Sequence, residues 1–395
     1  MYRFAPSPTT DLHISNLQIA LLNYICAKQA GEPFIVRIED GDKAHIIEGK
    51  DQDILDTLAL FGISYSQLYY QSHNFKYHLQ FASTLLDTKK AFICFCPHEN
   101  ELSACDGTCE HLSSEEVLNI PKPFVIRMKK LEHIGDSFVI MRTDKYPTYT
   151  FACACDDMLQ GVTTIIREDE QEPNAPKEEH IRKSIGYDQA MHYTHVPTLL
   201  CPKDESDVTW LLNQGFMPEA IVNYLLLLSH PTPVEIFTLE EAISWFDITK
   251  ISKAPVNFDI EKLRFINREH IKRIPDMELS KRIGYACENI GKLAKLYTED
   301  VSTTFEIKQK VDALFAKKAF DATFENESKL LQELILNAPY CETFDAFKAY
   351  LVEKSGLKDE AFFKPLHLCL TGADHGLDLA MVYPLIKNYL KEIVR

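Results

Sequence analysis

No stretch of this sequence is apolar enough to cross a membrane or to act as a secretory signal. Its apolar runs stay short of the roughly 18 residues that a membrane-spanning helix needs. Prolines interrupt the chain within its first eight residues, where a signal peptide would need an apolar core. Internal repeats and low-complexity tracts are also missing. We therefore expect a cytoplasmic protein with no membrane partner.

Positive charge is scarce. The chain has 42 lysines and arginines against 58 aspartates and glutamates, a net charge of -16. This balance argues against nonspecific binding of polyanions, but it leaves room for a local basic groove. The 11 cysteines in 395 residues do not make a small disulfide scaffold, so we expect reduced thiols, some of them candidate metal ligands. A chain of this length predicts two or three domains.

The sequence pattern divides the chain into two halves. Strands and helices alternate at the start, with strand Tyr2–Ala5, a helix over 16–29 and a strand over 33–39, which implies parallel strands. Residues 121–200 predict four further strands and a helix over 175–185. From about residue 204 the pattern is helical to the end. We therefore expect an α/β half followed by an all-α half.

A polar loop, "CFCPHENELSACDGTC", contains four closely spaced cysteines. Four thiols in this spacing can close around one tetrahedral Zn²⁺ and leave no open position, which is typical of a structural site. The alternative is a coincidence of buried cysteines, but the polar loop argues against it. The expected ligands are Cys94, Cys96, Cys105 and Cys109, with His98 and His111 in reserve.

The first residues, "RFAPSPTTDLHISN", have the order of a phosphate-binding strand, turn and helix but lack its glycines. Together with "FIVRIEDGD", "YPTYTFACACDDMLQGVTTIIR", "WLLNQGFMPEAIVNYL" and "ITKISKAPVNFDIEKLRFIN", this opening resembles the glutamyl-tRNA synthetases. The resemblance covers nearly the whole chain. It is closest to the shorter second synthetase of some bacteria, which charges tRNA-Gln with glutamate. The cysteine loop looks more like that of glutamyl-queuosine synthetase, a relative without a helical half.

The resemblance implies a Rossmann-type class I synthetase catalytic domain followed by an all-α domain. The expected catalytic domain is 1–202, with a zinc-binding insertion at about 91–136. A helical linker that contacts the tRNA stem follows at 203–258, and 259–395 is the anticodon-binding-type domain. Relatives of this kind are usually monomers.

The activity that the resemblance implies is that of a glutamate–tRNA ligase of the AMP-forming type. ATP with Mg²⁺ activates glutamate, which is then transferred to tRNA of the Glu or Gln type. A guanidinium fork suits a substrate carboxylate, and Glu39 matches the group that receives the substrate amine. By match to family motifs, the glutamate pocket consists of Arg3, Ala5, Ser7, Glu39, Tyr149 and Arg167. The alternative for each charge is an ordinary solvated side chain.

The ATP side departs from the family pattern. His13 would still bind the polyphosphate, but Ser15 stands where relatives have a glycine against which adenine packs. Gln18 stands where relatives often have arginine, and "IREDEQ" replaces "IRGEDH". The expected nucleotide-binding residues are His13, Ser15, Asn16, Glu170, Leu199 and Leu200.

The lysine-rich loop of the second family signature is absent. Strand "VPTLL" leads directly into "CPKDESDVTWLLNQGF", so Lys203 is the only lysine there and, with His13, the expected catalytic group. Loss of one such charge-stabilising group typically costs roughly 10²–10³ in rate. A second short deletion lies near 132–136. The similar segment "KISKAP", 250–255, follows "WLLNQGF" instead of preceding it and matches a structural linker.

Two interpretations remain open at this point. The first is an active, shortened glutamate–tRNA ligase. The second is a catalytically silent paralogue that binds glutamate, a glutamyl-adenylate-like ligand or tRNA in a regulatory or repurposed role. The losses on the ATP side favour the second, and the full-length architecture favours the first. Function belongs to the site and not to the fold.

Overall fold

The computed structural model describes residues 1–96, 105–130, 137–202, 207–320 and 323–395. These residues form two compact units. The first unit contains Met1–Thr209 and Leu225–Phe258, and the second contains Trp210–Tyr224 and Asp259–Arg395. Within the described ranges, no helix combines the length and apolar character needed to cross a membrane. The functional boundaries expected at 202 and 258 stay a prediction.

The core of the first unit is a parallel sheet, as the alternation of strands and helices predicted. Its strand order is β3-β2-β1-β7-β8, and every neighbouring pair is parallel. The strands are β1 (Tyr2–Phe4), β2 (Phe34–Ile38), β3 (Gln67–Tyr70), β7 (Thr164–Glu168) and β8 (His192–Val196). A parallel sheet brings the carboxyl ends of its strands to one edge, where ligands of such folds bind.

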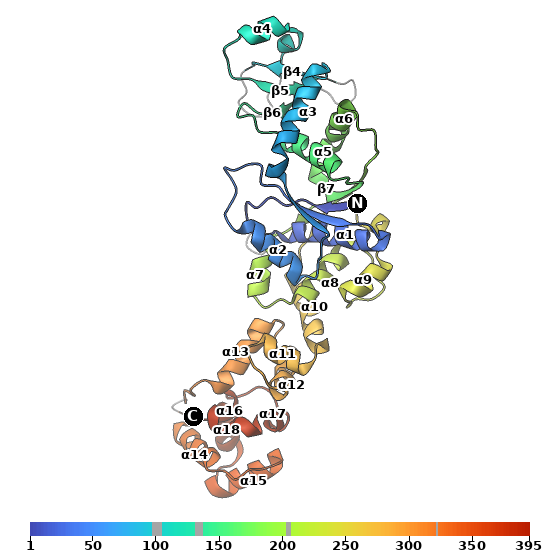
Figure 1. The fold of residues 1–395 in the computed structure, drawn as a ribbon. Helices are drawn as coiled ribbons and strands as arrows, with labels where there is room; N and C mark the ends of the chain where they lie inside the picture. Colours follow the sequence, from blue (N-terminus) through green and yellow to red (C-terminus); the bar gives the residue numbers. More distant parts are fainter. Residues whose placement is uncertain (97–104, 131–136, 203–206, 321–322) are drawn as a thin grey trace. The chain divides into compact units, whose positions relative to one another are not determined.

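Helix α1 (Ile14–Ala30) packs on strands β1, β2 and β7 of this sheet, and α9 (Leu239–Trp245) packs on α1 (Figure 1). Helices α3 (Phe75–Asp87), α5 (Tyr149–Leu159) and α6 (Ala175–Ile185) pack on one another, and α2 (Lys50–Leu60) lies between β2 and β3 in the chain. Most of α1 is buried, including Gln18, whose amide donates to the Leu225 carbonyl at 3.2 Å and the Ser229 hydroxyl at 3.1 Å. Gln18 therefore joins α1 to the end of α8 (Pro218–Ser229).

Helix α5 was not predicted from the sequence. Its first three residues, Tyr149, Thr150 and Phe151, favour strands, and tertiary packing overrides this preference. One face, with Phe151, Ala154 and Cys155, packs in a core with Leu85 and Met128 among others. The opposite face carries Tyr149, Cys153 and Asp157, which are spaced four apart and so lie above one another.

A separate antiparallel sheet, from Ala91 to Met141, overlaps the insertion expected at about 91–136, whose bounds stay a prediction. Its strand order is β4-β5-β6, with β4 (Ala91–Cys94), β5 (Val125–Met128) and β6 (Phe138–Met141). The 3-10 helix η2 (Thr108–His111) and α4 (Ser114–Asn119) lie between β4 and β5 in the chain. The deletion expected near 132–136 falls outside the described residues.

Helices predominate among the described residues after 204, as predicted. A short parallel pair, β9 (Leu199–Leu200) with β10 (Val256–Asn257), belongs to the first unit, and α7 (Val208–Asn213) and α8 follow β9 in the chain. The second unit continues with α10 (Ile260–Arg273), α11 (Asp276–Arg282), α12 (Glu288–Leu296), α13 (Thr304–Phe315), α14 (Glu325–Leu336), α15 (Phe344–Ser355), α16 (Asp359–Thr371), α17 (Leu379–Ile386) and α18 (Leu390–Ile393).

Candidate active site

A cavity of about 270 Å³ opens where strand β2 ends. Its wall includes Ser7, Glu39, Gln71, Arg142, Tyr149 and Ala152. Three of the six residues expected to bind glutamate therefore lie on one cavity: Ser7 from the loop after β1, Glu39 from the end of β2, and Tyr149 from the first turn of α5. This size suits a small polar molecule of the amino-acid class.

A chain of buried ion pairs includes Glu39, which lies on the wall of this cavity. Arg37 donates to the Asp157 carboxylate at 2.6 Å and to Glu39 at 3.2 Å. Arg3 lies 3.4 Å from the same oxygen of Asp157. All four residues are buried. Removal of one member would leave an uncompensated buried charge, so the network fixes the position of Glu39 beside the cavity.

The two carboxylates of this network respond differently to burial. Burial raises the pKa of Glu39 above its ordinary value, and the nearby Arg37 and Arg3 only partly oppose that rise. Burial also acts on Asp157, but there Arg37 and Arg3 prevail and lower its pKa. Asp157 is therefore the stably charged counter-ion of Arg37 and Arg3. The charged form of Glu39 would be stabilised by a further cation.

The remaining expected pocket residues are not on the wall of this cavity. Arg167 pairs with Glu178 at 2.8 Å and lies 5.2 Å from the centre of the Tyr193 ring. Its Nε and Nη2 atoms are buried and have no hydrogen-bond partner in the described part of the chain. Arg3 is 4% exposed, and Ala5 is half-buried. The unused guanidinium N–H groups of Arg167 retain the capacity to bind an anion.

Several residues of this region were missed by the sequence reasoning. They are Arg37, Gln71, Arg142, Cys153 and Asp157. An arginine inside the apolar strand "FIVRI" was a readable signal, since a buried charge requires a partner. Asp157 stood in the quoted "DD" pair, but its role depends on α5, which was not predicted. Cys153 carried no signal of its own.

The start of α1 holds the expected phosphate-binding group. His13 caps this helix, and its Nδ1 atom accepts the Ser15 backbone N–H at 3.1 Å. A backbone N–H can only donate, so Nδ1 holds its lone pair and the proton of the neutral ring is on Nε2. The Ser15 hydroxyl lies 2.8 Å from Nδ1. Ser15 thus contacts His13, and Asn16 beside it is exposed.

The other expected nucleotide-side residues are distributed over several segments. Glu170 is exposed in the 3-10 helix η3 (Asp169–Asn174), Leu199 is buried, and Leu200 is 50% exposed. Lys203 lies outside the described residues. The similar segment "KISKAP" follows α9, and its Lys250 pairs with Asp247 at 3.3 Å.

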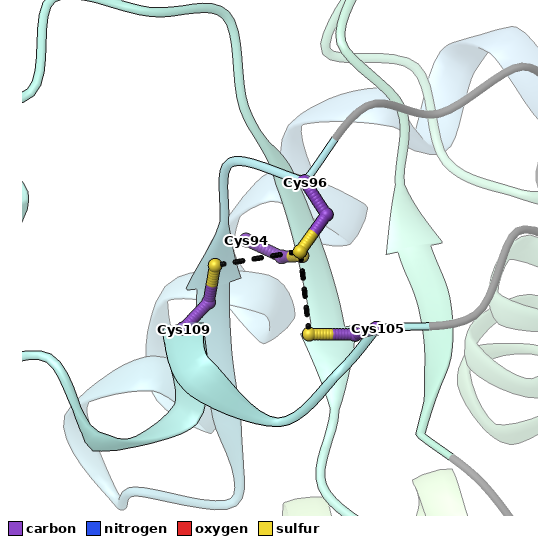
Figure 2. A group of neighbouring side chains, drawn as sticks. All are labelled: Cys94, Cys96, Cys105 and Cys109. Carbon is purple, nitrogen blue, oxygen red and sulfur yellow. Dashed lines mark hydrogen bonds between the residues drawn. The ribbon is translucent and has the colours of Figure 1, made fainter.

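The four expected cysteines of the insertion come together (Figure 2). Their sulfur atoms all lie within 4.8 Å of one another, and Cys96 is 3.7 Å from both Cys105 and Cys109. A tetrahedron with Zn–S bonds of about 2.3 Å has edges of about 3.8 Å. The group can therefore hold a metal ion. His111 is exposed and not part of it, and His98 lies outside the described residues.

Comparisons with known proteins give a consistent result. Residues 1–120 and 124–265 match the family described as tRNA synthetases class I (E and Q), catalytic domain. The chain is 49% identical over 433 aligned positions to glutamate–tRNA ligase 1 of Campylobacter jejuni, with 100% of both chains covered. It is 48% identical over 432 positions to the protein of the same name from Campylobacter curvus, again with 100% of both covered.

A solved structure shares the fold. It is a glutamate tRNA ligase from Elizabethkingia meningosepticum in complex with its amino acid, with a TM-score of 0.78 at 23% identity and coverage of 99% of this chain and 97% of that one. The alignment with the Campylobacter jejuni protein spans 433 positions against 395 residues in this chain, so that relative contains segments with no counterpart here.

Proposed function

The chain belongs to the class I tRNA synthetases of the glutamate and glutamine type, and from this membership we propose that it acts as a glutamate–tRNA ligase. The observation that carries the proposal is the cavity beside Glu39, backed by a buried network of alternating charges. Two full-length relatives at 48–49% identity carry the name of this activity.

The cavity region offers groups of the right charge for glutamate. The free amino acid carries one ammonium group and two carboxylates at neutral pH. Glu39 would receive the ammonium group, and Arg3 and Arg167 would supply guanidinium N–H donors for the carboxylates. Tyr149, which is 44% exposed at the cavity, and Ser7 would complete the wall. An amino acid without a side-chain carboxylate would leave buried guanidinium N–H groups without an acceptor, and this disfavours it.

The reaction proceeds in two steps. One oxygen of the bound α-carboxylate attacks the α-phosphorus of ATP, so that glutamyl-adenylate forms and pyrophosphate leaves. A terminal hydroxyl of tRNA then attacks the activated carbonyl and releases AMP. The Nε2–H group of His13 would donate to the polyphosphate at the start of α1, where the helix dipole also favours negative charge. ATP would bring Mg²⁺ with it.

We propose that the ion in the cysteine group is zinc. Four sulfur ligands with no open position are typical of a structural site, and the observed sulfur spacing of 3.7 Å suits Zn–S bonds. Such a site would hold β4 to the segment 105–109 and so stabilise the insertion. The purified protein should contain about one zinc per chain by metal analysis. A protein free of zinc after purification without chelators would contradict this site.

The proposed partner is tRNA of the Glu or Gln type, and the proposed place of action is the cytoplasm. We expect the protein to act as a monomer. The helical second unit would contact the tRNA, by analogy of fold with the family.

One observation favours a second candidate function. The alignment with the Campylobacter jejuni relative is longer than this chain, in line with the loop that the sequence lacks between β9 and α7. A chain without that loop would still bind glutamate or tRNA if it had lost adenylation. This candidate is the catalytically silent paralogue.

Charging of tRNA tests the proposed function. Purified protein is incubated with ATP, labelled glutamate and unmodified tRNA-Glu or tRNA-Gln, and acid-stable label on the tRNA is counted. We expect labelled tRNA with glutamate and none with glutamine. Absence of charging on both tRNAs, with glutamate binding intact, would favour the silent paralogue.

A further inference from the structure

We propose that Cys153 is a positioning residue of the amino-acid site. Its thiol holds one oxygen of Glu39, so that the other oxygen is presented to the substrate ammonium group. The inference rests on the proposed function, because it takes glutamate as the occupant of the cavity. Neither the family resemblance nor the comparisons assign a role to this residue.

The geometry of Glu39 carries the inference. The Cys153 sulfur lies 3.2 Å from Glu39 Oε1, and Arg37 donates to the same oxygen, also at 3.2 Å. Within the described residues, Oε2 has no hydrogen-bond partner. Glu39 is 7% exposed and lines the cavity. One oxygen is therefore fully occupied, and the other remains for a ligand.

The two donors come from different elements, and this is why both matter. Arg37 lies on β2 two residues before Glu39, which follows the last residue of that strand, so the two move together. Cys153 lies on α5, one helical turn after Tyr149, which forms part of the same cavity wall. The thiol contact thus ties the carboxylate that follows β2 to the helix that carries Tyr149, so that Glu39 and Tyr149 keep their relative positions on the cavity wall.

Cys153 is suited to donate. Its side chain is fully buried, and this burial raises the pKa of the thiol well above its ordinary value, so the S–H proton is retained at neutral pH. A thiol is a weaker donor than a hydroxyl. We therefore expect the contact to orient Glu39 rather than to dominate its energy.

The charged groups around Glu39 determine how loss of this contact would be detected. Arg37 faces it from β2, Arg3 from β1, and Tyr149 and Cys153 from α5. Asp157 on α5 and Glu178 on α6 raise the pKa of the Cys153 thiol. Burial raises the pKa of Glu39, and the thiol hydrogen bond lowers it. Loss of the thiol would raise that pKa further.

The test compares three variants with the wild type by calorimetric titration with L-glutamate between pH 5 and pH 8. Cys153→Ala removes the donor, and Cys153→Ser keeps one. Cys155→Ala is the matched control, because Cys155 is equally buried on the same helix but packs in the apolar core away from Glu39. Thermal unfolding of each variant confirms that it is folded.

We expect Cys153→Ala to weaken glutamate binding about 3- to 10-fold, the size of one ordinary hydrogen bond. The pH below which affinity falls should also move upward, because protonated Glu39 cannot receive an ammonium group. Cys153→Ser should restore both quantities, and Cys155→Ala should match the wild type. Loss of affinity with no shift in pH dependence and no rescue by serine would mean that the thiol only fills space.

Two further outcomes separate this inference from the proposed function. Wild-type binding with an unchanged Cys153→Ala variant would overturn the positioning role and leave the ligase proposal standing. Absence of glutamate binding by the wild type would overturn both.

Discussion

The amino-acid cavity and the start of α1 follow neighbouring strands of one sheet, but they are held in different ways. The cavity rests on buried ion pairs among Arg3, Arg37, Glu39 and Asp157. The start of α1 has one imidazole, that of His13, which contacts the backbone N–H and the hydroxyl of Ser15. A buried charge network is costly to lose in part, whereas a half-exposed helix end tolerates substitution. The comparison suggests that the proposed glutamate pocket is harder to change than the proposed ATP side.

The largest expected effect concerns the stability of the cavity. Arg37→Leu leaves Asp157 and Glu39 without their main counter-ion, and we expect the free energy of unfolding to fall by about 3–5 kcal/mol. Urea denaturation measures this fall. Lys183→Ala is the control: its pair with Glu179 is about 60% exposed, so we expect a change of under about 1 kcal/mol. Similar changes in both variants would show that the buried pairs beside the cavity contribute no more to stability than an exposed pair.

The second effect concerns the phosphate end alone. His13→Ala should lower the rate of glutamate activation by roughly 10²–10³, the usual cost of one group that stabilises developing charge. Glutamate affinity, measured by calorimetry without ATP, should be unchanged, since His13 belongs to α1 and not to the cavity wall. A parallel loss of glutamate affinity would show that the two regions are not separate.

The third effect concerns Glu39, the carboxylate proposed to receive the substrate ammonium group. Glu39→Gln should weaken glutamate binding about 10- to 100-fold, the cost of one charged hydrogen bond. In the wild type, burial raises the pKa of Glu39. Binding should therefore be constant near neutral pH and weaken as the pH falls through that raised value. Glu39→Gln should lose this pH dependence. Asp42→Asn, on the same wall but half-exposed, is the control and should retain it.

The smallest effect concerns Ser15. Ser15→Gly removes the side chain beside His13 and opens the space that a nucleotide base needs, so we expect a few-fold lower KM for ATP. Ser15→Ala loses the hydroxyl but keeps Cβ, and it should not show this gain. If both variants lower the KM for ATP to the same extent, loss of the hydroxyl contact with His13 causes the gain and the added space does not.

The fold could be predicted from the sequence where periodicity was clear. The alternation at the start gave the parallel strands, and α6 lies where its pattern predicted it. Helix α5 was not predicted in this way, because its first residues, Tyr149, Thr150 and Phe151, favour a strand and the packing of both faces stabilises the helix. The cysteine group needed no fold at all, since its four ligands are close in sequence.

The candidate site was accessible only in part. Glu39, Tyr149 and Ser7 were identified by resemblance, and they meet at one cavity. Arg37 and Asp157 were missed because they are 120 positions apart, and only the tertiary structure brings a strand and a helix together. Cys153 could not be found from sequence, since an isolated cysteine among buried residues carries no functional signal before its neighbour is known.

The most direct test of the whole account is the exchange of labelled pyrophosphate into ATP, with glutamate and tRNA both present. The account predicts exchange above background in the wild type and its loss when glutamate is omitted, because the retained pocket would deliver glutamate to a reduced but working phosphate site. Absence of exchange, although calorimetry shows bound glutamate, would contradict it and would indicate a synthetase fold that binds its amino acid without activating it.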